Sequence, residues 1–282
     1  MTTEIQYGKT RVLFYRLATT AAAPFAASVD VDVFGERFLA AYTKGDNREV
    51  VATDTMKNFV YATAADFKGD SLESYTSFLG HHLLGTYPQM ERIRVAAREV
   101  ALDPASGPQG PSNVVFRLTR TDAAFAEGAF ERRGSYSAMT EARSGLAGLV
   151  LLKTTGSSFA AFARDQYTTL PELKDRPLTI RLDAHWRYAD LQDASGDGDG
   201  HVPAARVRES LETTFHEFNS RSIQHLVHEM GTRLLARFES LSEIGFAGEN
   251  HTPDLVKEGS GTVSVFAEPR QTFGKIGLVL RR

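Results

Sequence analysis

Apolar and polar residues alternate near the N-terminus with the two-residue period of a half-buried strand. The alternation is clear over Thr10–Arg16 and again over Ser28–Phe34, which includes VDVDVF, and it predicts two strands. The segment Lys44–Asn47 has turn composition. The apolar-rich runs 50–53 and 59–63 then predict two more strands. The chain is therefore expected to open with β-structure.

The period then changes to that of a helix. Four large apolar residues recur at helical spacing, and Asp70 or Ser71 can cap the helix that they predict: Leu72, Tyr75, Leu79 and Leu83. Strands are predicted at 92–102 and 113–119. The segment DPASGPQGPS between them, rich in Pro, Gly and Ser, is predicted to be a loop.

The second half of the chain repeats this plan at low sequence similarity. Two helices are predicted from apolar residues at helical spacing between Val207 and Phe238, with a fresh N-terminus at Ser222 after the polar stretch 219–222. Strands are predicted on both sides of the helices, at 134–140, 148–152, 178–188, Thr262–Phe266 and 274–280. Two strand-strand-helix-strand-strand halves predict an α+β protein with mostly antiparallel pairing, divided into domains 1–130 and 131–282 with a boundary near Gly128–Arg133.

Composition narrows the classes of function. The chain has 282 residues, a formal net charge of -3 and a sequence pI near 6.3, so nothing in the global charge favours nucleic acid or an anionic membrane surface as a partner. An anionic substrate must be captured by local cations. The chain contains no cysteine, which excludes disulfides, thiolate metal sites and a cysteine nucleophile.

Targeting signals are not evident in the sequence. The N-terminal segment MTTEIQYGKTRVLFYRL lacks the uninterrupted apolar stretch of a signal peptide, and no run of about 18 apolar residues could cross a membrane. The chain ends in Leu280-Arg281-Arg282 and so lacks the Ser-Lys-Leu type of peroxisomal address. We expect a cytoplasmic protein of bacterial type.

Three separated blocks resemble the urate oxidase (uricase) family and together span nearly the whole chain. The first is Tyr7-Gly8-Lys9 followed by a β segment, and the second is GDNREVVATDTMKNFVYATA, from Gly45 to Ala64. The third is LKTTGSSFAAFARDQYTTLPELKDRPLTIRLDAHWRY, from Leu152 to Tyr188, which is similar to the family's most distinctive stretch.

This resemblance implies a fold, an assembly and a reaction. Members of the family have the tunnelling fold, in which each chain carries two modules and a homotetramer encloses a barrel-walled tunnel with active sites between subunits. They oxidise urate with O2 and water to 5-hydroxyisourate and hydrogen peroxide, without a cofactor or a metal. The sequence agrees on this last point, since it offers no dinucleotide fingerprint, phosphate loop or metal cluster.

The family's substrate-gripping residues match Arg176, Gln224 and Phe159 here. A guanidinium can pair two acceptors of an anion in a fixed plane, a primary amide can match the edge of a purine-like ring, and a phenyl face can stack on it. The family also uses the residue before the glutamine and a small polar clamp above the ring. The matched residues that complete the substrate-binding set are Thr53, Asp54, Ile223 and Asn250.

The family's proton relay matches Lys9 and Thr53. An ammonium group releases its proton more readily when it is desolvated or lies near another cation. Many members add a His two positions after the asparagine, where this chain has Thr252 and where His251 stands one place early. Either residue can be the third member of the relay, and the sequence alone leaves both open.

Other features have simpler explanations. Adjacent residues of a helix point in different directions, so His81-His82 is expected to be structural rather than a metal site. The segment Gly196–His201 lacks the spaced carboxylates of a calcium loop and is expected to connect a strand to a helix. Trp186 is expected to pack within a strand.

Two other functions compete with urate oxidation. One is hydrolysis or aldol chemistry on a pterin or related heterocycle by an enzyme of the same fold, although most such relatives are single-module chains. The other is a non-catalytic purine-binding scaffold, against which the presence of both Lys9 and Thr53 argues. Consumption of urate and oxygen by purified protein would separate the three.

Overall fold

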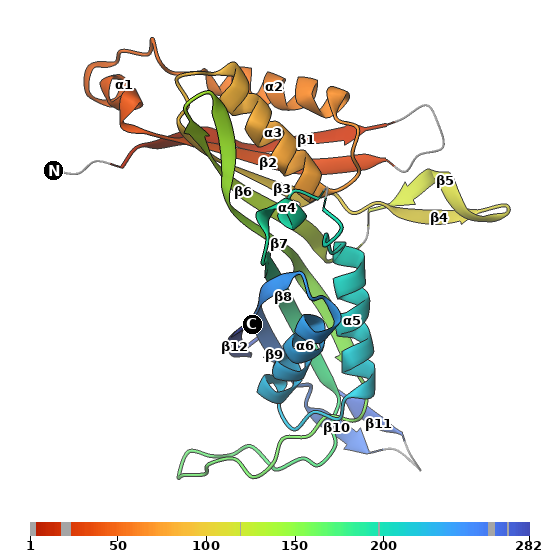
Figure 1. The fold of residues 1–282 in the computed structure, drawn as a ribbon. Helices are drawn as coiled ribbons and strands as arrows, with labels where there is room; N and C mark the ends of the chain where they lie inside the picture. Colours follow the sequence, from red (N-terminus) through yellow and green to blue (C-terminus); the bar gives the residue numbers. More distant parts are fainter. Residues whose placement is uncertain (1–3, 18–23, 119, 197, 259–262, 270) are drawn as a thin grey trace. The chain divides into compact units, whose positions relative to one another are not determined.

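The computed structural model describes most of the chain (Figure 1): residues 4–17, 24–118, 120–196, 198–258, 263–269 and 271–282. The chain forms two compact units. The first unit comprises the residues up to Gly145 together with Arg187–His201, and the second comprises Leu146–Trp186 together with Val202–Arg282. Among the described helices, none is long and apolar enough to cross a membrane.

The first unit is an antiparallel sheet covered on one face by helices (Figure 1). Its strands are hydrogen-bonded in the order β1-β2-β3-β6-β7, and the pairs β1–β2, β2–β3 and β3–β6 are antiparallel. Their bounds are β1 (Gln6–Arg16), β2 (Phe25–Phe34), β3 (Arg92–Glu99), β6 (Ala123–Arg133) and β7 (Tyr136–Lys153), of which β7 passes into the second unit.

Two long helices, α2 (Thr53–Asp66) and α3 (Leu72–Thr86), enclose the core of this unit. Tyr75 lies at its centre, fully buried against the rings of Phe14, Phe25 and Phe67, and its hydroxyl donates to the carbonyl of Val60 in α2 at 3.0 Å. Burial of the ring raises the pKa of the Tyr75 hydroxyl. Shorter elements are the 3-10 turn η1 (Glu36–Phe38), α1 (Leu39–Lys44) and α4 (Leu191–Ala194).

The second unit repeats the plan. Its strands follow the order β7-β8-β9-β12, with β8 (Leu178–Tyr188), β9 (Leu241–His251) and β12 (Gly274–Arg281). The helices are α5 (Ala204–Glu217) and α6 (Ile223–Arg237), and α6 packs on β9 and β12. A two-stranded ribbon pairs β10 (Leu255–Glu258) with β11 (Ser264–Phe266). Each unit thus has two strands, two helices and two strands in order, which confirms the predicted α+β class and repeated plan.

The predicted strands at 50–53 and 59–63 are wrong, because α2 begins at Thr53 and continues to Asp66. The buried residues of α2 are Met56, Val60, Thr63 and Ala64, which recur at helical spacing. Local clusters of β-branched and aromatic residues suggested strands, but burial along one helical face outweighs that intrinsic preference.

The predicted loop in DPASGPQGPS is also wrong. Residues Asp103–Gly107 form β4 and residues Gly110–Arg117 form β5, which pair as an antiparallel hairpin with Gly107 opposite Gly110. Gly110 has φ +127, a conformation that L side chains rarely adopt. Proline is tolerated in a ribbon of two edge strands, because it costs few ladder hydrogen bonds there. Thr119, at the end of the predicted strand, lies outside the described residues.

Other differences concern strand boundaries. The strands predicted at 134–140 and 148–152 are parts of one strand, β7. The strands β6 and β9 were not predicted from the sequence. Residues Gly128–Arg133, near which the domain boundary is predicted, lie within β6, and the compact units divide within β7; the predicted division into two domains stays a prediction. The predicted strand Thr262–Phe266 corresponds to β11, and Thr262 itself lies outside the described residues.

The predicted helix starts are confirmed in detail. Ser71 caps α3 by accepting from the backbone N–H of Ser74 at 3.1 Å, and Ser222 caps α6 by accepting from that of His225 at 3.1 Å. Both helices therefore begin where a hydroxyl can satisfy an otherwise unpaired amide.

Two glycines of α3 allow the packing of this helix to be tested. A Cβ at Gly80 would lie 2.5 Å from the ring of Phe130 in β6, whereas a Cβ at Gly85 would meet nothing within 4 Å. Gly80→Ala should therefore lower the free energy of unfolding by about 1–3 kcal/mol through overpacking. Gly85→Ala, the matched control, should leave it unchanged or raise it by up to about 1 kcal/mol through helix propensity. Denaturant melts of both variants would check this, and equal effects would contradict the packing argument.

Candidate functional site

A bulge in β1 sets the position of Lys9. Lys9 pairs with Val31, and the register then shifts before Val12 pairs with Val29. Within the shift, Arg11 has φ +56 and its backbone N–H donates to the Asp30 carboxylate at 2.7 Å. Bulges bend a strand locally and re-aim a side chain. Lys9 thus sits at an irregular point of the sheet rather than in a regular ladder.

The start of α2 lies beside this part of β1. The backbone N–H of Val51 donates to the Tyr7 hydroxyl at 3.2 Å. Asp54 accepts from the Lys57 ammonium at 2.5 Å, and the Lys57 contact, followed by the weaker charge of Lys9, holds the pKa of the Asp54 carboxyl below its usual range. Thr53 is the first residue of α2, and its hydroxyl makes no hydrogen bond within the described chain. The fold therefore brings three predicted site residues together in the first unit.

Arg176 is a buried cation in the second unit. It is 7% exposed, and burial lowers the pKa of its guanidinium. Its Nη1 donates to Thr252 Oγ1 at 3.0 Å, while its Nε is buried without a hydrogen-bond partner among the described residues. Nor does any described carboxylate lie within ion-pairing distance of it. A buried cation with only neutral neighbours favours an anionic ligand.

Arg176 faces a cavity of about 360 Å³. Segments from three parts of the second unit line it: Phe159, Thr169–Pro171, Asn250, Thr252, Asp254 and Thr272–Gly274. The lining includes the buried guanidinium of Arg176, the rings of Phe159 and Phe273, the carboxylate of Asp254 and several small polar groups. A guanidinium beside aromatic rings suits a small, flat, polar ligand that carries a negative charge on the side of Arg176.

Phe159 forms one side of this cavity as a preorganised platform. Its ring stacks on Phe162 with centroids 4.8 Å apart and an interplanar angle of 12°. The Arg176 guanidinium carbon lies 5.5 Å from the centroid of the Phe159 ring. The ring is thus fixed by its neighbours before any ligand arrives.

Thr252 lines the cavity and His251 does not. Successive side chains of a strand point to opposite faces, so Asn250 and Thr252 share one side and Glu249 and His251 the other. Thr252 donates to Asn250 Oδ1 at 3.2 Å and accepts from Arg176. His251 instead contacts the Glu249 carboxylate at 3.0 Å. Of the two residues that the sequence left open, Thr252 is the one that lines this cavity, and its part in the proton relay stays a prediction.

Gln224 and Ile223 form the first turn of α6 and are not among the residues that line the cavity. Ile223 is buried, while Gln224 is exposed. The strip Ser157–Phe159 connects this helix start to the rest of the site, because Ser158 N donates to the carbonyl of Ser220 at 2.8 Å and Arg176 N donates to that of Ser157 at 2.9 Å.

Sequence reasoning missed the residues that support Arg176. Asp175 accepts from the Thr155 hydroxyl at 2.5 Å and from Gly156 N at 2.7 Å, and these bonds hold the pKa of the Asp175 carboxyl below its usual range. Asp175 is therefore engaged with the 155–156 turn and leaves Arg176 unpaired. The block that identifies the family contained this Asp-Arg pair, but nothing in it distinguished their partners.

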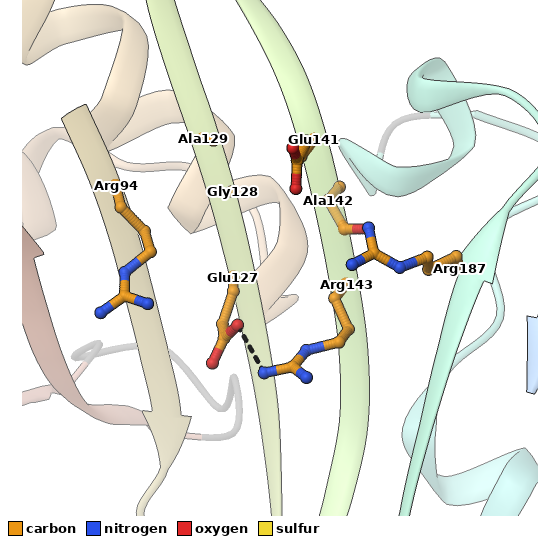
Figure 2. Close-up of a pocket in the computed structure, with 8 residues that line it drawn as sticks. All are labelled: Arg94, Glu127, Gly128, Ala129, Glu141, Ala142, Arg143 and Arg187. Carbon is orange, nitrogen blue, oxygen red and sulfur yellow. Dashed lines mark hydrogen bonds and ion pairs between the residues drawn. The ribbon is translucent and has the colours of Figure 1, made fainter. Parts of the chain in front are cut away.

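A second cavity, of about 230 Å³, lies on the charged face of the first unit's sheet (Figure 2). Its main charges are paired across strands: Arg143 contacts Glu127 at 2.8 Å, and Arg94 contacts Asp32 at 2.8 Å. It contains no residue that the sequence predicted to be functional. These pairs stabilise neighbouring strands and need no ligand.

The remaining sequence features have structural surroundings. His81 contacts the Ser137 hydroxyl at 2.7 Å, whereas His82 contacts the carbonyl of Phe78 at 2.8 Å, so the two rings have separate partners. Trp186 is fully buried in β8. The segment Gly196–His201 was expected to connect a strand to a helix, but α4 (Leu191–Ala194) follows β8, so the segment lies between α4 and α5; Asp197 lies outside the described residues. Among the described residues, no three His, Asp or Glu side chains gather as metal ligands.

Comparison with known proteins supports one assignment. A family model described as uricase matches residues 5–123 and 142–276. The uricase of Halalkalicoccus jeotgali is 40% identical over 256 residues, which cover 89% of this chain and 84% of that protein. The uricase of Haloferax volcanii is 38% identical over 258 residues, with the same coverage. The crystal structure of a uricase from Bacillus fastidious superposes with a TM-score of 0.91 at 35% identity, covering 98% of this chain and 93% of that one. The chain belongs to the uricase family.

Proposed function

We propose that this chain is a urate oxidase that converts urate, O2 and water into 5-hydroxyisourate and hydrogen peroxide without a cofactor. The observation that carries the proposal is the buried, unpaired guanidinium of Arg176 beside the fixed ring of Phe159 in a cavity of about 360 Å³. Urate is a planar anion with oxygen acceptors at its edge. Guanidinium pairing and ring stacking would hold it in one plane and one orientation.

The reaction moves two electrons from urate to O2, which leaves as hydrogen peroxide, and water supplies the oxygen atom of the product. Lys9 and Thr53 remove a proton from bound urate, which makes the ring more electron-rich. Asn250 and Thr252 hold the O2 or water above the ring, and Thr252 passes protons on toward the lysine-threonine pair. Gln224 and the backbone amide of Ile223 bind the edge of the urate ring opposite the edge that Arg176 binds. Asp54, the last member of the substrate-binding set, lies next to Thr53.

We also propose that the active site forms in a homotetramer of the tunnelling fold, between the first unit of one chain and the second unit of another. The supporting observation is the repeated plan of the two units, with Lys9 and Thr53 in the first and Arg176 in the second. In addition, β1 and β12 end the order of strands, and edge strands favour pairing with a further chain. Joining such sheets between chains would build the barrel wall of a tunnel.

The oxidase reaction gives the first test. Purified protein treated exhaustively with chelator should consume urate at neutral pH and form one hydrogen peroxide per urate and per O2. Urate absorbance, an oxygen electrode and a peroxide assay measure the three quantities. Urate loss without peroxide, or activity that returns only with one metal, would contradict the proposal. Turnover of a pterin but not urate would instead favour the heterocycle enzyme, and binding without turnover would favour the scaffold.

Arg176→Ala should damage urate binding more than folding. The substitution removes a charge-assisted contact made in a desolvated site, so the dissociation constant for urate without oxygen should rise by roughly a hundredfold, which is about 3 kcal/mol. The melting temperature should change little, because the buried charge is uncompensated in the free protein. Arg181→Ala, at an exposed position of β8, is the matched control and should bind urate normally. Unchanged affinity in Arg176→Ala would remove the anion anchor from the proposal.

The shared site can be tested by mixing two inactive variants. Lys9→Met should bind urate in the absence of oxygen but not turn it over, because it lacks the proton carrier and keeps the gripping residues. Arg176→Ala should fail to bind. Dissociation and reassembly of an equal mixture should restore activity in about a quarter of the sites, those that combine an intact first unit with an intact second unit.

The control for this experiment is each variant reassembled alone, which should stay inactive. Mass spectrometry or tagged chains would confirm that hybrids have formed. Confirmed hybrids without activity would show that both halves of a site come from one chain.

A further inference from the structure

Three separate segments of the second unit carry the residues proposed to grip urate. They are the strip that ends in Phe159, the segment that ends in Arg176, and the turn that leads into α6 and Gln224. Because these segments lie far apart in the sequence, their relative position depends on contacts between them. This inference rests on the proposed function of that site.

The strip Ser157–Phe159 lies between the other two segments. On one side, Ser157 bridges to Ser220 and Ser158 N donates to the Ser220 carbonyl at 2.8 Å. On the other side, Phe159 exchanges backbone bonds of 2.9 and 3.0 Å with Leu173. Ser157 and Ser220 are each 2% exposed, and their hydroxyls lie 3.5 Å apart. The strip is therefore the only described backbone link between the Arg176 segment and the turn before α6.

Lys153, the last residue of β7, adds side-chain contacts to this backbone link. Its ammonium donates to the carbonyl of Phe218 at 2.9 Å, where α5 ends, and lies 5.7 Å from the ring centroid of Phe215. A cation at the carboxyl end of a helix satisfies carbonyls that the helix leaves unpaired. Lys153 thus ties the end of β7 to the chain just before Ser220.

The turn between Lys153 and the strip packs closely against the side chains of Lys153 and Asn219. Gly156 has φ +77, and a Cβ there would lie 2.6 Å from Asn219 Oδ1 and 3.0 Å from Lys153 Cε. The backbone at Gly156 is therefore enclosed between the lysine side chain and the turn before α6. Asp175 fixes the same turn from the Arg176 side through Gly156 N.

We propose that Lys153 is a positioning residue for urate: by holding the Phe218–Ser220 turn against the Gly156 turn, it sets the distance between Arg176 and Phe159 on one side and Gln224 on the other. It contacts no ligand itself. It lies instead at a neighbouring cavity of about 620 Å³, which Asp175, Ser157 and Ser220 also line. Without the Lys153 ammonium, the Gln224 side chain would no longer be held at a fixed distance from the Arg176 guanidinium. Small displacements of substrate-binding groups lower both the rate and the affinity.

Lys153→Met tests this role. It should raise both KM and the dissociation constant for urate measured without oxygen by about tenfold or more, while kcat falls less and the pH profile of kcat keeps its shape. Lys9→Met should give the opposite pattern, with affinity retained and kcat lost. Lys153→Arg, which restores a cationic donor, should recover most of the affinity.

The matched control is Lys174→Met. Lys174 lines the same 620 Å³ cavity and carries the same charge, but no described hydrogen bond of its side chain ties two segments together. KM should therefore stay at the wild-type value. An equal rise in KM for Lys174→Met and Lys153→Met would mean that the charge of the cavity matters rather than the tie, and would overturn the proposal.

Gly156→Ala perturbs the same contact between Lys153 and the turn before α6 while keeping the lysine. It tests the positioning role if Lys153→Met does not fold. The added methyl group should push Asn219 and Lys153 apart and raise KM in the same direction. A folded Lys153→Met or Gly156→Ala with wild-type KM and affinity refutes the positioning role. Failure of the wild-type chain to oxidise urate would refute the proposed function instead, so the two failures are distinguishable.

Discussion

The Arg176 guanidinium is held almost entirely out of water, and among the described residues its side chain has one hydrogen-bond partner, the hydroxyl of Thr252. Removing a cation from water is costly unless an opposite charge accompanies it. The nearest carboxylate in sequence, Asp175, is engaged by Thr155 and Gly156, so the chain keeps its neutralising charge away from Arg176. A buried guanidinium without an ion-pair partner among the described residues favours an anionic ligand, which would supply the missing partner.

Holding such a charge in place requires a rigid frame, since a mobile arginine would turn toward water. The frame consists of backbone bonds: Arg176 N to the Ser157 carbonyl, and Phe159 paired with Leu173. Strand alternation then decides which polar groups join it. Asn250 and Thr252 occupy one side of the end of β9, and His251 the other. A shift of one residue there would exchange a neutral hydroxyl for an imidazole next to a buried cation.

Prediction from the sequence succeeded where the cause was local. The caps Ser71 and Ser222 act through amides within three residues, and both were visible in the sequence. The helix α2 was missed because its evidence, one buried face from Met56 to Ala64, depends on what packs against it. For the site, matched blocks identified Arg176 and Phe159. Two features of the site could not be predicted from one sequence. The choice between His251 and Thr252 depends on strand register, and the contact of Lys153 with Phe218 depends on packing between distant segments.

The division of the proposed chemistry between the units has a physical consequence. Lys9 lies in the first unit near the charges of Asp54 and Lys57, whereas Arg176 lies in the second, where its described hydrogen-bond partner is the neutral hydroxyl of Thr252. If both cations lay side by side within one unit, each would destabilise the charge of the other before any ligand bound. That repulsion would lower the free energy of unfolding. In the proposed interchain site, the Lys9 of one chain would meet the Arg176 of another only on assembly, when urate would lie between them and its negative charge would offset both.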